Sequence, residues 1–262
     1  MGNNLFQMRF RGRTVRENLD RAIADGKLSE QPDGTLIPTA REDSPRQLPV
    51  RKSRHLACQF LNNVMFKIVY DQSAVPFGCR TCFKVKAAPS TFRGLIALRG
   101  ILEEVPYHSK CGVDLFNPHS RDVYAGYTYL DGLGEARAAW RDLRARMDAH
   151  PDLGPDARLV IKRGCSNYEA ACGPSDRWTF RDGLAQLEEA LQARFREPPR
   201  EPFDYRRARM TSMVHWIQTA YNLKDDTYLD FTGGKPLHPA TVSYPPEDPS
   251  GDGDAPSSRA GP

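Results

Sequence analysis

FKVKAAPSTFRGLIALRGILEEVP, residues 83–106, changes its hydrophobic period halfway along. Its first five residues alternate between apolar or small and basic side chains, which is the period of a β-strand with one buried face. After Ser90, a typical N-cap residue, apolar residues recur at helical spacing until Pro106, which cannot continue a helix. The stretch therefore predicts a strand at 83–87, a short connection, and a helix that ends before Pro106.

The residues that follow extend this pattern into a recognisable order of elements. Residues 110–117 and 122–130 are strand-like and are separated by a turn, residues 133–148 predict a helix, and residues 158–163 predict a fourth strand. The order is β-α-β-β-α-β, that of the ferredoxin-like arrangement. We therefore expect an α+β protein with a ferredoxin-like core over about residues 75–165.

The flanking segments predict less regular structure. Residues 1–50 are expected to form an N-terminal arm, with one helix that begins at the N-cap Thr14 and a Pro- and Asp-rich linker. The core domain would span residues 51–232, with a helical stretch at 55–70 and a helical extension at 175–222. Residues 233–262 are rich in Pro, Gly and Ser and predict a disordered tail.

Composition narrows the class of protein. The 262 residues are 39% hydrophobic and 27% charged with a net charge of +4, which is ordinary for a globular protein and gives no general polyelectrolyte signal. No apolar run is long enough for a signal peptide or a membrane helix, so we expect a cytoplasmic protein without membrane contact. In that reducing compartment, the six cysteines would be thiols or metal ligands.

The cysteines are the main candidates for a functional site. In a ferredoxin-like sheet with strand order 4-1-3-2, the starts of strands 1 and 2 and the end of strand 4 lie along one edge. Cys79 and Cys82 precede the first predicted strand, Cys111 opens the second, and Cys165 follows the fourth. We expect these four thiols to converge, with Cys172 as a reserve ligand.

Four thiolates at one point require a cation, and both zinc and a 4Fe-4S iron-sulfur cluster accept four of them. One Cys-x-x-Cys joined by two isolated cysteines favours the iron-sulfur cluster over zinc, which usually takes two such pairs. His108 and His119 are alternative ligands, and Cys58 is expected to be a buried thiol. The cluster would serve electron transfer, redox sensing or structure, with a protein partner or a larger assembly.

Other interpretations of the cysteines stay open. They could be core residues, because cysteine is among the most buried residue types. A thioredoxin-like dithiol is a further option, although its Cys-x-x-Cys normally follows a strand, whereas Cys79 and Cys82 precede one.

Two alternatives use other residues. Basic and aromatic side chains on the outer face of the sheet would suit a nucleic-acid-binding module, unless a helix covers that face or the lysines are simply solvated; they are Lys84, Lys86, Lys162, Tyr124, Tyr127 and Tyr129. Asp114 and Asp122, at the two ends of a hairpin, could hold a catalytic metal ion. Hairpin aspartates are usually turn formers, and the chain contains none of the common nucleotide-binding or hydrolase motifs.

Overall fold

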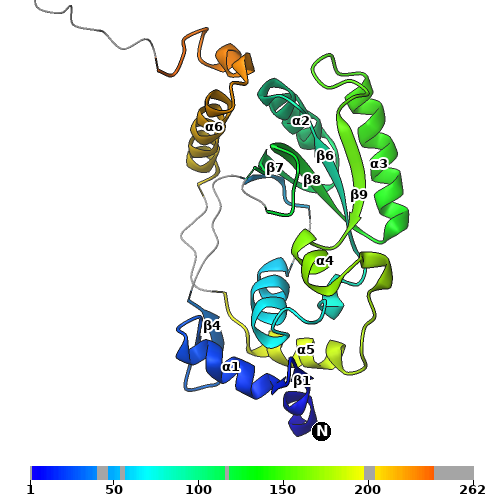
Figure 1. The fold of residues 1–262 in the computed structure, drawn as a ribbon, viewed down its shortest axis with the longest axis vertical. Coiled ribbons are helices and arrows are strands. Elements are labelled where there is room, and N and C mark those ends of the chain that lie inside the picture. Colours follow the sequence, from blue (N-terminus) through cyan, green and yellow to red (C-terminus); the bar gives the residue numbers. More distant parts are fainter. Residues whose placement is uncertain (1, 40–46, 54–56, 116–117, 198–203, 239–262) are drawn as a thin grey trace, which may run out of the picture.

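The computed structural model describes residues 2–39, 47–53, 57–115, 118–197 and 204–238, and shows an α+β protein, as the sequence predicts (Figure 1). Most of the expected tail, residues 239–262, lies outside the described residues. Among the described helices, none combines the length and the apolar character needed to span a lipid bilayer.

A five-stranded antiparallel sheet forms the centre of the fold. Its strands lie in the order β5-β7-β8-β6-β9, and their bounds are Gln47–Arg51 (β5), Cys82–Ala88 (β6), His108–Val113 (β7), Tyr124–Asp131 (β8) and Arg158–Arg163 (β9). α2 (Phe92–Glu104) connects β6 to β7, and α3 (Leu133–Asp148) connects β8 to β9. The bounds of α3 and β9 are those predicted from the sequence.

The fifth strand was not predicted. β5 pairs with the outer side of β7, and it comes from the segment that the sequence analysis assigned to a linker. Pro49 has no N–H to donate, which is tolerated because β5 is an edge strand, and the pairing is irregular between Pro49 and Arg51.

Three helices cover one face of the sheet. α2, α3 and α6 (Tyr205–Asn222) pack against it through one hydrophobic cluster, which includes Val85 of β6, Leu98 of α2, Leu143 of α3 and Trp216 of α6. The N-cap of α2 is Thr91 rather than Ser90, since the Thr91 hydroxyl accepts a hydrogen bond from the Gly94 N–H. Because strand side chains alternate, Lys84 and Lys86 lie on the opposite face.

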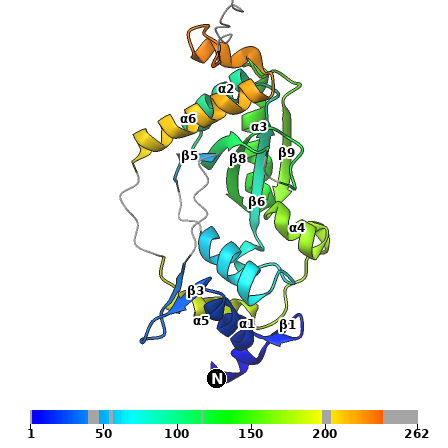
Figure 2. The ribbon, with the colours of Figure 1, turned by 60° about the vertical axis from the view of Figure 1, so that its left-hand side comes forward.

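A second hydrophobic cluster forms around the N-terminal segment, which lies at the opposite end of the molecule from α2 and α6 (Figure 2). α1 (Val15–Ala24) has the predicted capping box between Thr14 and Glu17. It packs with a π-helix at Gln59–Val69 and with α5 (Leu184–Arg194). The segment also contains the small hairpins β1–β2 (Arg9–Phe10 and Arg13–Thr14) and β3–β4 (Leu28–Glu30 and Leu36–Pro38).

Short elements join these two parts. α4 (Ser166–Cys172) follows β9, and a 3-10 helix at Phe77–Cys79 precedes β6. Their side chains form a third, small cluster in which Tyr168 packs against Phe66 of the π-helix, with ring centroids 4.5 Å apart. Two further 3-10 helices, at Ser175–Arg177 and Asp226–Phe231, and one at Gly2–Gln7 complete the described elements.

Candidate functional site

The face of the sheet opposite α2, α3 and α6 is polar. Lys84 on β6 is paired in register with Tyr129 on β8 and with Lys162 on β9, while Lys86 is paired with Tyr127. α4 and the π-helix lie at one end of the sheet in both ribbon views (Figures 1 and 2). We call this surface the polar face; its strands carry Lys84, Lys86, Lys162, Tyr127 and Tyr129.

A thiol and an ammonium group meet at the α4 end of the polar face. The Lys84 Nζ donates to the Cys165 Sγ at 3.0 Å, and Lys84 is only 9% exposed. Burial alone would raise the pKa of Cys165, but Lys84, and then Lys110 and Lys162, together hold it below its ordinary value. Burial likewise opposes the charge of Lys84, yet Cys165 and neighbouring groups keep the Lys84 pKa well above its ordinary range. The contact therefore favours the thiolate form of Cys165 and the ammonium form of Lys84.

Cys79 has the opposite character. Its side chain is buried, and its Sγ lies 3.7 Å from the Tyr168 hydroxyl. Burial raises the Cys79 pKa well above its ordinary value, and the nearby thiols of Cys165, Cys82 and Cys58 raise it further. Cys79 consequently holds its proton more tightly than Cys165 does.

Cys82 is joined to the Cys165 segment through the backbone. The Gly164 N–H donates to the Cys82 carbonyl at 2.8 Å, which extends the β6–β9 pairing by one residue beyond Phe83 and Arg163. Cys82 is partly exposed and, two residues before Lys84, points to the polar face. Cys58, which the apolar sequence around it predicts to be buried, is exposed and lies just before the π-helix.

A buried carboxylate holds the turn that carries Cys79. Glu188 of α5 accepts hydrogen bonds from the N–H groups of Phe77 at 2.6 Å and Gly78 at 2.9 Å, and from the Tyr70 hydroxyl at 2.7 Å. A Cβ at Gly78 would lie 2.9 Å from the Leu61 side chain, so the turn fits closely against the π-helix. No sequence motif indicated Glu188, because its contacts bridge more than 100 residues.

Cys111 does not join the other thiols. It lies three residues into β7, fully buried among the side chains under the helices, and burial raises its pKa to about 12. Cys111 is paired with Gly126 of β8, and Gly126 is paired with Ala87 of β6. Ala87 lies five residues beyond Cys82, so Cys111 is displaced from Cys82 by about 17 Å along the strand direction. The expectation failed because β7 begins at His108, so Cys111 neither opens the strand nor faces the polar side.

Cys172 is also apart from Cys165. It ends α4, seven residues further on, which corresponds to about 10 Å along a helix, and its Sγ faces the Gln72 carbonyl at 3.9 Å. His108 packs edge-to-face against Tyr129, and His119 lies in the connection from β7 to β8. Within the described residues, which include all six cysteines, no three His, Cys, Asp or Glu side chains form a group that could hold a metal ion.

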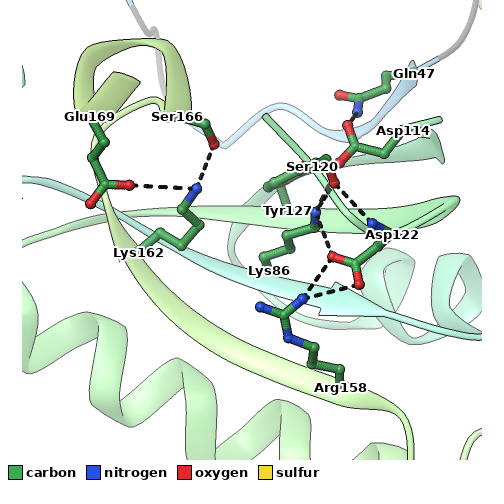
Figure 3. Close-up of polar contacts among 10 residues, drawn as sticks. All are labelled: Gln47, Lys86, Asp114, Ser120, Asp122, Tyr127, Arg158, Lys162, Ser166 and Glu169. Atoms are coloured by element: carbon green, nitrogen blue, oxygen red, sulfur yellow. Dashed lines mark hydrogen bonds and ion pairs between the residues drawn. The ribbon is translucent and has the colours of Figure 1, made fainter. Parts of the chain in front are cut away.

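Asp114 and Asp122 do converge, but on an ammonium group (Figure 3). The Lys86 Nζ lies 2.9 Å from Asp114 Oδ2 and 2.8 Å from Asp122 Oδ2. The Tyr127 hydroxyl donates to Asp114 at 2.7 Å, and Arg158 donates to Asp122 at 3.1 Å. We call these five residues the Lys86 network. Its two cations balance its two carboxylates, and Lys86 occupies the place between the carboxylates.

The lysines and tyrosines predicted for nucleic-acid binding do not form an open surface. Tyr124 points to the helix-covered side, where its hydroxyl donates to Asp225 at 2.9 Å. Lys84 and Lys86 are buried and paired with anionic groups, and Lys162 lies 3.8 Å from Glu169. Most of the positive charge of the polar face is therefore matched within the protein and is not offered to phosphates.

No family model, no curated protein and no solved structure matches this chain.

Proposed function

We propose that this protein carries out thiol–disulfide chemistry, with Cys165 as the attacking thiolate. The observation that carries the proposal is the 3.0 Å contact between the Lys84 ammonium and the Cys165 sulfur at a site where Lys84 is almost fully buried. A thiolate, and not a thiol, is the nucleophile in such reactions, and reactive cysteines lie next to cationic groups.

The reaction would use two cysteines. The Cys165 thiolate attacks one sulfur of a substrate disulfide, forming a mixed disulfide and releasing the other substrate sulfur as a thiolate. Cys82 then loses its proton to solvent and attacks the Cys165 sulfur, which releases the second substrate thiolate. The substrate gains two electrons, and the protein is left with a Cys82–Cys165 disulfide.

Cys82 suits the second role better than Cys79. Its backbone is hydrogen-bonded to the residue before Cys165, and its side chain is partly exposed on the same face. Cys79 is buried, contacts the Tyr168 hydroxyl, and has a raised pKa, so it forms a thiolate less readily.

Site-resolved alkylation with iodoacetamide at pH 7, followed by mass spectrometry, tests the proposal. Cys165 should react faster in the folded protein than in the unfolded chain, and Lys84→Met should slow it at least about tenfold, the effect of one pKa unit on the thiolate fraction. Lys27→Met, which removes a charge at an exposed pair with Asp25, should leave the rate unchanged. Oxidised glutathione should produce a Cys82–Cys165 disulfide. A Cys165 that reacts no faster when folded than when unfolded would refute the proposal.

A metal centre is the second candidate, and one observation favours it. Cys79, Cys82 and Cys165 pack in the same small hydrophobic cluster, and Cys58 is near enough to raise the Cys79 pKa, so three separate chain segments bring four cysteines into one region. The ligands of an iron-sulfur cluster, or failing that of zinc, would be these four, with Cys58 in the place first assigned to Cys111. In that case the thiols must move closer together than they are in the described arrangement.

Metal content distinguishes the two candidates. Protein purified without oxygen should contain iron with sulfide, or zinc, if the metal centre exists, and iodoacetamide should then react slowly with Cys165. Cys58→Ser should lower the metal content, whereas Cys111→Ser, in the core, should not. Colourless, metal-free protein in which Cys165 reacts fast with iodoacetamide would exclude the metal centre and support the thiol–disulfide proposal.

We also infer the finer points of architecture and setting. A ferredoxin-like core is supported by the spatial order β9-β6-β8-β7, in which the fourth, first, third and second strands of the βαββαβ unit follow one another. Six cysteines outside disulfides suit a cytoplasmic location. A protein that carries a disulfide, or that reduces the Cys82–Cys165 disulfide again, is the partner we expect.

A further inference from the structure

The polar face carries one positive charge beyond its internal pairs. The Lys86 network is balanced, Lys84 faces the Cys165 thiolate, and Lys162 lies near Glu169. Lys110 is different: its Nζ lies 5.5 Å and 5.9 Å from the ring centroids of Tyr127 and Tyr129, and among the described residues no carboxylate pairs with it. This ammonium is half-buried on two aromatic rings, where water screens its charge less than at an open surface.

The surplus charge lies beside the reactive thiolate. Lys84 and Lys110 both lie within 6 Å of the Tyr129 ring centroid, at 5.1 Å and 5.9 Å. Lys84 also donates to Cys165. Two ammonium groups therefore lie close to the Tyr129 ring, and Lys110 is the one that does not contact the Cys165 sulfur.

The proposed reaction increases this imbalance. When Cys165 enters a mixed disulfide it loses its negative charge, and the buried Lys84 is left without its anionic partner. A buried cation without a partner is costly, so an anionic group brought in by the substrate would stabilise the mixed disulfide. A neutral substrate would provide no such compensation.

We propose that the site selects a disulfide substrate with a carboxylate or phosphate group near the reacting sulfur, and that Lys110 binds this anionic group. The inference rests on the proposed function and names its substrate class. It gives Lys110 a role in specificity that differs from the role of Lys84, which stabilises the nucleophile.

Two alkylating reagents of similar size but different charge test the inference. Iodoacetate carries a carboxylate and iodoacetamide does not, so the ratio of their rates at Cys165 measures the preference for an anion. The ratio should be higher in the folded protein than in the unfolded chain, and Lys110→Gln should lower it about tenfold, as expected for one nearby charge that is partly shielded from water. Lys110→Arg should keep most of the preference, and Lys27→Gln should not affect it.

The outcomes separate this inference from the function on which it rests. In one outcome, Cys165 reacts fast with iodoacetamide while the ratio of the iodoacetate rate to the iodoacetamide rate equals that of the unfolded chain. That result would overturn the anion preference but not the proposal of a reactive thiolate. Slow reaction with both reagents would overturn the proposed function and this inference with it. Inorganic phosphate and acetate, added separately, should slow iodoacetate, and the stronger competitor identifies the anionic group; no slowing by either would contradict the inference.

Discussion

Replacing Lys86 with Met should destabilise the protein strongly. Lys86 is 5% exposed, and its ammonium lies within 3 Å of two carboxylates, of which the Asp114 side chain is only 2% exposed. Asp122 keeps its ion pair with Arg158, whereas Asp114 loses its 2.9 Å ion pair with Lys86. Breaking a buried pair by removing one partner costs about 3–5 kcal/mol. For a domain of this size the melting temperature falls by about 2–4 °C per kcal/mol, so we expect a decrease of about 6–20 °C.

Urea unfolding, followed by circular dichroism, measures the free energy of unfolding and allows a double-mutant cycle with Asp114→Asn. Asparagine removes the charge that faced Lys86 and can still accept the hydrogen bond from Tyr127. The double variant should therefore be more stable than Lys86→Met alone, by about 1 kcal/mol or more, because the two residues are coupled. Lys27→Met should change stability by less than about 0.5 kcal/mol. If Lys86→Met costs under about 1 kcal/mol, or if the two costs simply add, the Lys86 network does not hold the structure together as argued.

Two further changes test local features. Thr14→Ala removes the capping box of α1 and should cost about 1 kcal/mol in the free energy of unfolding, measured by urea titration, whereas Thr14→Ser should restore most of it. Burial raises the pKa of Glu188 above its ordinary 4.5, despite the hydrogen bonds that it accepts, so the folded protein binds this proton more tightly than the unfolded chain. Stability should therefore decrease as the pH rises above about 4.5, and Glu188→Gln should flatten that part of a pH series of melting curves; an unchanged slope would contradict the assignment.

Elements with a clear local signal could be predicted from the sequence. The Thr14 and Glu17 capping box marks the start of α1, and the regular helical spacing of residues 133–148 fixes both ends of α3. β5 and α4 could not be found in the same way. β5 is an edge strand that includes Pro49 and is recognised only by its distant partner β7, and α4 is too short to show a period.

The site followed from topology in part. β6 and β9 are neighbours in the sheet, and the Gly164 N–H donates to the Cys82 carbonyl, so Cys82 and Cys165 lie at the same end of these strands. The predicted positions of Cys111, beside the other thiols, and of Tyr124, on the outer face of the sheet, were wrong for the same reason. Side chains alternate along a strand, and both residues lie on the helix-covered face. The approach of Cys58 to Cys79, like the hydrogen bonds of Glu188, depends on packing between distant segments and has no local sequence signal.

Lys84 and Lys86 lie two residues apart on one strand, but we expect their replacement to change different properties. Replacing Lys84 should lower the reactivity of Cys165, whereas replacing Lys86 should lower the melting temperature. Without Lys84, Cys165 can discard its charge by binding a proton, because an ordinary thiol has a pKa of about 8.5 and is mostly protonated at pH 7. Without Lys86, the carboxylates ordinarily stay ionised at that pH. Lys84→Met should therefore melt close to the wild type while Cys165 loses its reactivity, and Lys86→Met should melt much lower. If Lys84→Met were destabilised as much as Lys86→Met, the buried ammonium at position 84 would be a structural group, and the case for a reactive thiolate would lose its main support.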